Sequence, residues 1–216
     1  MLKRIFILLF LFIPMFYSCK KEEPTHFYIP QIVKDYAAYK PGSYWIYSID
    51  STEVEDSVFV SDYKEGETFD EGDENYEYSE IRHYISSDLK NKKGEEFFHV
   101  GIGSRGISYE YNWEGEAFHG LDFWYLDNGK FILEPSSYNN KVDTLTQIET
   151  SNLFGKTYKD IVYCKDVSIL IRGVSDSSKM DTIELWVAKH TGIIKRVMSY
   201  DSFKTTYVLK RHNVIQ

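Results

Sequence analysis

The chain has few cysteines and only one long apolar run, and each scarcity excludes a class of protein. Its 216 residues include two cysteines, Cys19 and Cys164, too few for the disulfide framework of a small secreted domain. The apolar run covers residues 5–16. As a helix with a rise of ~1.5 Å per residue it would span about 18 Å, against a hydrocarbon core of about 30 Å. It therefore does not predict a stable membrane-spanning helix.

Basic residues are also scarce relative to acidic ones. The chain has 25 Lys and Arg against 33 Asp and Glu, a formal charge of −8. A protein this acidic does not hold nucleic acid by neutralising phosphates. Anionic lipid head groups would repel it as well, so any attachment to a membrane needs another source of affinity.

Recognisable catalytic motifs are missing too. Residues 101–106 match the pattern G-x-G-x-x-G, but the strand-like residues 107–113 follow, where a dinucleotide site needs a helix. Ser104 has Ile102 where a nucleophile elbow needs glycine, and the histidines show no zinc-ligand spacing. Cys164 has apolar neighbours typical of a small structural residue. We therefore predict no catalytic residue, no metal ligand and no cofactor, and expect that the protein is not an enzyme.

The N-terminus is typical of a secretory signal. Lys3 and Arg4 precede the apolar run, and Ser18 comes directly before Cys19. The segment Phe16-Tyr-Ser-Cys19 resembles the lipobox of bacterial lipoproteins. This resemblance implies that residues 1–18 are cleaved and that the Cys19 sulfur carries a diacylglycerol; two or more acyl chains hold a protein stably on a bilayer. The alternative is an uncleaved N-terminal anchor helix.

The residues after Cys19 suggest a location. Residues 20–23 (KKEE) resemble the lipoprotein export signal of Bacteroidota, which directs lipoproteins to the outer face of the outer membrane. The resemblance implies an outer-membrane lipoprotein facing the cell surface; the alternatives are the periplasmic face and an ordinary polar tether. We divide the chain into a signal peptide (1–18), a lipidated cysteine with a flexible tether (19–28) and one β-rich domain (29–216).

Strand signals dominate the rest of the chain. There are 18 Tyr and 14 Phe, residues that favour strands. Asn128-Gly129 between apolar runs predicts a β-hairpin over residues 121–133. One short helix is expected within residues 30–40. We predict a mainly β fold, either a curved antiparallel sheet or an open barrel. The strands are expected at residues 43–49, 57–63, 76–87, 97–102, 107–113, 161–172, 182–189, 193–200 and 203–211.

Three further segments resemble uncharacterised lipoproteins of Bacteroidota. They are an opening over residues 39–47 (YKPGSYWIY), a turn over residues 153–160 (LFGKTYKD) and a closing segment over residues 185–195 (LWVAKHTGIIK). These patterns imply a fold rather than an activity. Some relatives are similar to the lipoprotein-carrier type, a curved sheet with an apolar concave face.

An aromatic face is the candidate binding site. Trp45, Tyr47, Trp113 and Trp124 could stack on sugars or hold an acyl chain, although aromatic residues in strands also form ordinary core pairs. The leading hypothesis is a binding module for an apolar or glycan ligand, and the alternative is an accessory subunit of a surface protein complex. The acidic residues 65–74 are expected to form a solvated loop, with a calcium site as the alternative.

Overall fold

The computed structural model of the chain describes residues 23–50, 52–71, 79–113, 116–126, 130–133, 144–153, 155–169, 180–200 and 203–216. These ranges contain one helix and thirteen strands in a single sheet. The elements are β1 (Thr25–Phe27), α2 (Gln31–Ala37), β2 (Tyr44–Ile49), β3 (Glu55–Glu71), β4 (Ser79–Asn91), β5 (Glu96–Gly103), β6 (Gly106–Trp113), β7 (Glu116–Tyr125), β8 (Phe131–Leu133), β9 (Thr144–Leu153), β10 (Lys156–Ile169), β11 (Met180–Ala188), β12 (Gly192–Tyr200) and β13 (Phe203–Asn213).

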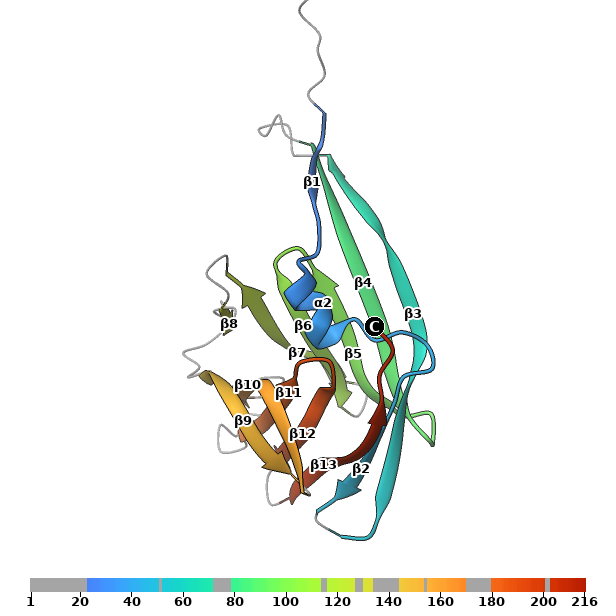
Figure 1. The fold of residues 1–216 in the computed structure, drawn as a ribbon, viewed down its shortest axis with the longest axis vertical. Helices are drawn as coiled ribbons and strands as arrows, with labels where there is room; N and C mark the ends of the chain where they lie inside the picture. The colour runs from blue at the N-terminus through green and yellow to red at the C-terminus, as the bar shows by residue number, and fades with distance from the viewer. Residues whose placement is uncertain are drawn as a thin grey trace, which may run out of the picture.

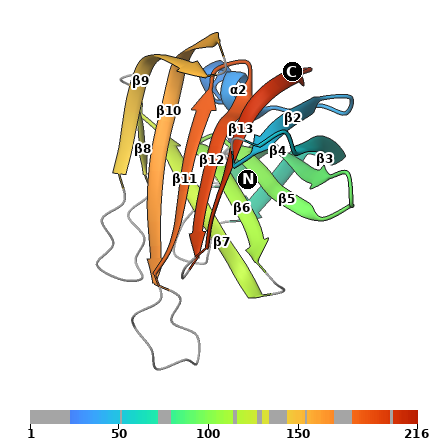
Figure 2. The ribbon, with the colours of Figure 1, turned by 90° about the horizontal axis from the view of Figure 1, so that it is seen from below.

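The strands form an antiparallel meander that nearly closes on itself. Their order is β8-β7-β6-β5-β4-β3-β2-β13-β12-β11-β10-β9, so the last strand returns to pair with β2. The two ends of this path, β8 and β9, lie beside each other (Figures 1 and 2). The prediction of an antiparallel sheet or open barrel with little helix is confirmed.

Side chains alternate between the interior of the barrel and its outer surface, as the two-residue period of a strand requires. On β5, Phe98, Val100 and Ile102 are buried, whereas His99 and Gly101 face outward. Large aromatic side chains fill much of the interior. The largest fully buried ones are Tyr39, Trp45, Tyr47, Phe98, Tyr109 and Phe123.

The helix α2 crosses one mouth of the barrel. Pro30 precedes it and its buried residues are Val33, Tyr36 and Ala37. The Tyr36 hydroxyl donates to the carbonyl of Asp160 on β10 at 2.9 Å, and its ring meets Phe131 of β8 edge-on at 5.2 Å. These contacts connect α2 to both sides of the gap between β8 and β9, and so hold the two ends of the sheet together.

The strands β3 and β4 are longer than expected. The segment expected as an acidic loop is in part a strand, because β3 continues to Glu71 and pairs with β4 throughout. The strand expected to end at residue 87 continues to Asn91 as β4, and the turn follows it. The Asn91 side-chain oxygen accepts the backbone N–H groups of Lys93 and Glu95 at 3.0 and 2.9 Å and so shapes that turn. Residues 72–74 lie outside the described ranges.

The predicted hairpin over residues 121–133 is present as the pair β7 and β8. Its turn residues, Asn128 and Gly129, lie outside the described ranges. The backbone N–H of Leu126 bonds to the carbonyl of Lys130 at 2.8 Å, next to the turn.

The strands β3 and β4 extend beyond the rest of the barrel as a long arm (Figure 1). β1 pairs with β4 on this arm in parallel, with Phe27 opposite Arg82. Just after β1, the ring of Tyr28 stacks on His83 of β4 at 4.5 Å. The base of the arm is the part of the fold that borders the candidate site.

Candidate functional site

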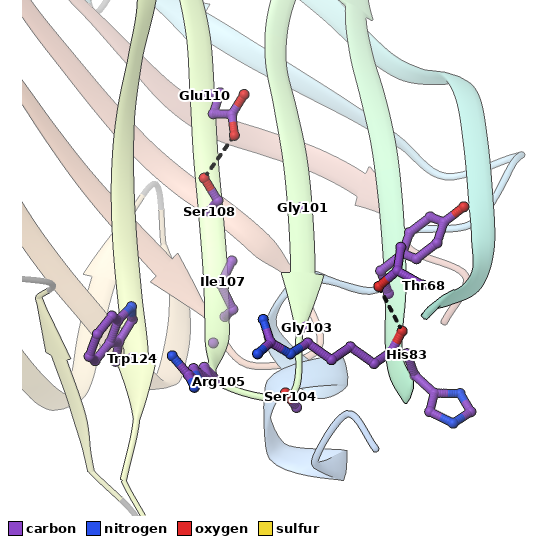
Figure 3. Close-up of a pocket in the computed structure, with 13 residues that line it drawn as sticks. Thr68, His83, Gly101, Gly103, Ser104, Arg105, Ile107, Ser108, Glu110 and Trp124 are labelled. Atoms are coloured by element: carbon purple, nitrogen blue, oxygen red, sulfur yellow. Dashed lines mark hydrogen bonds between the residues drawn. The ribbon is translucent and has the colours of Figure 1, made fainter. Parts of the chain in front are cut away.

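A groove of about 460 Å³ lies on the outer surface of the barrel across β4, β5, β6 and β7 (Figure 3). Its floor is formed by glycines. Gly101 and Gly103 face outward on β5, and Gly106 begins β6, so the backbone itself lines the groove there and is partly exposed. Figure 3 shows Trp124 on one side of this bare strip and Thr68 and His83 on the other.

The register of the strands places one aromatic residue on each side of the glycines. Tyr84 on β4 is opposite Gly103, and Trp124 on β7 is opposite Gly106. Gly103 and Gly106 flank the turn at residues 104–105, so all four lie close to one line across the sheet. With neighbouring strands ~4.8 Å apart, the two aromatic Cα atoms are separated by roughly 14 Å. The slot is open to solvent, with Tyr84 36% exposed.

The ring of Tyr84 lies flat because its neighbour is also a glycine. Gly66 on β3 is opposite Tyr84, and a Cβ atom built on Gly66 would lie 3.0 Å from the Tyr84 hydroxyl oxygen and 3.2 Å from two ring carbons. A side chain at position 66 would therefore push the ring upward. The glycine allows Tyr84 to rest on the sheet as a platform.

Polar groups surround the aromatic slot. The Ser108 hydroxyl donates to the Glu110 carboxylate at 3.2 Å, along the outer face of β6 (Figure 3). The Arg82 guanidinium donates to the Glu80 carboxylate through Nε at 2.9 Å. The groove thus offers a guanidinium, a carboxylate and a hydroxyl beside two aromatic rings. Planar charged groups and hydroxyls of this kind form hydrogen bonds with neighbouring hydroxyl groups of a ligand.

A second hollow of about 290 Å³ continues along the same surface. It is lined by Asp62, Lys64, Ser86, Asp88, Glu96 and His99. The His99 Nδ1 atom lies 2.5 Å from an Asp88 carboxylate oxygen. The Lys64 ammonium lies 3.2 Å from the Asp62 carboxylate, and its hydrogen bond lowers the pKa of Asp62 from its ordinary value. This hollow is strongly polar, in contrast to the aromatic slot.

Of the four aromatic residues predicted as a ligand face, Trp45 and Tyr47 lie apart from Trp124. Trp45 and Tyr47 are 1% exposed in the barrel interior. The indole N–H of Trp45 donates to the carbonyl of Thr191 at 2.7 Å, and the hydroxyl of Tyr47 to that of Ile193 at 2.8 Å. Both are core residues in this structure.

Trp124 lines the groove. The backbone of Trp113 ends β6, and its side chain does not belong to the part of the chain that the structure describes. Cys19 lies outside the described ranges, and Cys164 is fully buried.

Several groove residues carry no obvious sequence signal. Arg82, Tyr84, Ser108 and Glu110 look like ordinary strand residues until the register is known. Residues 101–106, which match G-x-G-x-x-G, form the end of β5, a short turn and the start of β6. The spacing of Gly101 and Gly103 is the sequence signal that could have indicated this groove. Two glycines separated by one residue lie on the same face of a strand and leave that face without side chains.

Among the described residues, no group of three or more His, Cys, Asp or Glu side chains is placed to hold a metal ion. The described ranges hold no helix whose length and hydrophobicity would let it span a bilayer.

Comparison with known proteins leaves the family of the chain undefined. No protein-family model matches it, and no curated protein matches it. Among solved structures, a protein from Parabacteroides distasonis described as a "putative lipoprotein" aligns with 89% of this chain and 100% of its own. The alignment has a TM-score of 0.38 and 11% sequence identity. An overlap at this level does not define a family, so the function is inferred from the residues of this chain.

Proposed function

We propose that the protein is a lipid-anchored lipoprotein of the outer membrane, facing the cell surface, and that it binds a glycan. The anchor is the acylated Cys19, supported by the charged, apolar and small-residue order of residues 3–19 and by the acidic pair that follows Lys20 and Lys21. The binding site is the groove between Tyr84 and Trp124.

The observation that carries the glycan is the pairing of two aromatic side chains, Tyr84 and Trp124, with a floor of glycines between them. The face of a pyranose ring presents C–H groups that pack against an aromatic ring, and its edge carries hydroxyls that need hydrogen-bond partners. Tyr84 and Trp124 supply the rings, while Arg82, Ser108 and Glu110 supply the polar partners. Because Gly101 and Gly103 have no side chains, there is room for the sugar between Tyr84 and Trp124.

Other ligands fit the groove less well. A peptide cannot add a strand here, because β5 is already paired with β4 and with β6 along both edges. An acyl chain favours a dry apolar cavity, whereas this groove is open and contains charged groups. The acidic balance of the chain disfavours nucleic acid.

The proposed activity is binding without catalysis. Glycoside hydrolysis uses a pair of carboxyl groups across the scissile bond. Of the described residues that line the aromatic groove, Glu110 is the one that carries a carboxylate, and Ser108 donates to it. A single hydrogen-bonded carboxylate suits recognition of hydroxyl groups.

Calorimetry on the full lipoprotein in detergent tests the proposal. The probes are maltohexaose, cellohexaose, xylohexaose, mannohexaose and chitohexaose, with palmitate as the apolar comparison. We expect at least one hexasaccharide to bind with a Kd between about 10 µM and about 1 mM, or roughly 4 to 7 kcal/mol. If palmitate binds and all five sugars fail, the site is not a glycan site.

A second candidate function is that of an accessory subunit in a surface complex. Tyr44 on β2 and Phe59 on β3 are opposite each other on the outer surface and are 43% and 41% exposed. An exposed aromatic pair of this kind suits a protein interface. If Tyr44→Ser with Phe59→Ser abolishes co-purification of a partner protein and no sugar binds, this second function replaces the first.

A further inference from the structure

We infer that the glycan is a linear oligosaccharide lying lengthwise along β5, directly on the backbone of Gly101 and Gly103, and reaching from the Tyr84–Trp124 slot to His99. This inference rests on the proposed function and specifies the shape of its ligand. Three observations carry it. The two glycines are not required by the fold, the two hollows join along β5, and the side chains that line β5 change from aromatic to hydroxyl to charged along its length.

The fold does not need glycine at positions 101 and 103. A Cβ atom at Gly101 would lie 3.8 Å from its nearest neighbour, the Ser108 Cβ, and one at Gly103 would lie 4.0 Å from the His83 carbonyl oxygen. Both distances are ordinary contacts or longer. Neither residue has a positive φ angle. Glycine inside a strand weakens it, so two outward glycines that nothing crowds imply that another molecule approaches the backbone.

Gly106 provides the contrast. A Cβ atom there would lie 1.7 Å from the carbonyl oxygen of Phe123, which is a severe overlap with backbone. Gly106 is therefore required by the close approach of β6 to β7. Because the neighbouring glycines meet no such barrier, the bare floor at Gly101 and Gly103 is not a by-product of strand packing.

The two hollows form one track. The outward residues of β5 are His99, Gly101 and Gly103, and Gly101 is opposite both Ser86 and Ser108. Gly101 and Ser108 line the aromatic groove, while Ser86 lines the polar hollow. Strand residues rise ~3.4 Å each, so Gly103 and His99 are about 14 Å apart.

A pyranose unit with its bridging oxygen advances by about 5 Å, given bonds of about 1.5 Å. The track therefore accommodates about three sugar units. The first position lies between Trp124 and Tyr84, and a sugar unit there can stack on one of these rings. At the second position the hydroxyls of Ser86 and Ser108 face the ligand's hydroxyls, and at the third the Asp88–His99 pair provides a polar end. This order predicts that affinity depends on chain length.

Two substitutions that fill the track test the inference, using the hexasaccharide that binds most tightly in the panel above. Gly103→Val and Gly101→Val add a β-branched side chain where space is open and where strands favour it. We expect both variants to keep or raise the melting temperature and to weaken hexasaccharide binding at least tenfold. The matched control is Thr150→Ile, which adds apolar bulk at an exposed position of β9, outside the groove, and should leave binding unchanged.

A length series on the unaltered protein provides a second test that does not depend on any variant folding. The affinity should rise at least tenfold from the monosaccharide to the trisaccharide of the same sugar and then level off. His99→Ala should weaken trisaccharide binding severalfold and leave disaccharide binding unchanged. If the hexasaccharide binds equally well to Gly103→Val, or no better than the monosaccharide does, the lengthwise track is wrong while the glycan function stands. If no sugar binds the unaltered protein, the proposed function itself fails.

Discussion

The hydroxyl groups of Tyr39 and Tyr109 lie 3.0 Å apart in the interior of the barrel, although the two residues are 70 positions apart in the chain. Both side chains are 0% exposed, and burial raises the pKa of each above its ordinary value, so both remain neutral. The Tyr39 hydroxyl donates its one proton to the carbonyl of Tyr36 at 2.5 Å. Tyr109 must therefore be the donor to Tyr39. This chain of hydrogen bonds connects the end of α2 to β6.

The direction of these bonds predicts unequal costs for removing each hydroxyl. Tyr39→Phe leaves the buried Tyr109 donor and the Tyr36 carbonyl without this partner, and we expect a loss of about 2–4 kcal/mol in the free energy of unfolding. Tyr109→Phe removes only a donor, and Tyr39 keeps its bond to Tyr36, so the loss should be about 0.5–1.5 kcal/mol. Urea denaturation of both variants measures the difference. Equal losses would show that the donor assignment is incorrect.

The aromatic slot gives a prediction about binding alone. Trp124→Ala and Tyr84→Ala each remove one stacking surface, and we expect each to weaken binding of the best hexasaccharide about 10-fold or more, by analogy with aromatic contacts worth about 1–3 kcal/mol in stacked recognition. The control is Tyr44→Ala, which removes an exposed ring from β2, outside the groove. Calorimetry should show unchanged affinity for the control. A loss of the same size in all three variants would place the sugar elsewhere.

The anchor gives a prediction about partitioning. Cys19→Ser removes the sulfur that would carry the diacylglycerol, so the protein should move from the detergent phase to the aqueous phase in a Triton X-114 separation. Cys164→Ser is the control, because Cys164 is fully buried on β10 and its Sγ atom faces the carbonyl of Leu185 at 3.9 Å. This control should stay in the detergent phase. If Cys19→Ser also stays there, an uncleaved N-terminal helix holds the protein instead.

The sequence predicts the strands and the antiparallel fold more reliably than it predicts the site. Strand positions follow from local patterns, such as the Asn128-Gly129 pair between apolar runs and the alternation along residues 161–171. The face of a strand is harder to predict. Trp45 and Tyr47 alternate with Tyr44 and Ile46, so both faces of β2 are apolar and the pattern does not show which one enters the barrel.

The groove could not be predicted because it depends on register between strands. Tyr84, Gly103, Gly106 and Trp124 come from four strands, and only the pairing of those strands aligns them. Charge was also misleading at the end of β3. Acidic residues from Glu65 onward suggest a solvated loop, yet pairing with β4 keeps Glu65 and Glu67 in a strand, with their side chains exposed.

The contacts of Asp35 predict how stability changes with pH at the mouth of the barrel. Burial acts to raise the pKa of Asp35, but hydrogen bonds from Gln31 and Lys189 and the charge of His190 outweigh it and lower the pKa from its ordinary value of 3.8. Gln31 donates to the carboxylate at 2.7 Å, and the Lys189 ammonium lies 3.3 Å away. Asp35 therefore joins α2 to the turn between β11 and β12.

Because the pKa is lower in the folded state than in the unfolded chain, the ionised carboxylate stabilises the fold above pH ~4, the unfolded value. This contribution is lost as the pH falls through the folded pKa. We expect Asp35→Asn to unfold at a lower urea concentration than the unaltered protein at pH 6, and the difference to shrink steadily below pH 4. Glu149→Gln, an exposed carboxylate on β9, controls for the loss of one charge and should change the midpoint little at pH 6. A difference between Asp35→Asn and the unaltered protein that stays constant down to pH 2 would mean that packing, and not the charge of Asp35, joins α2 to this turn.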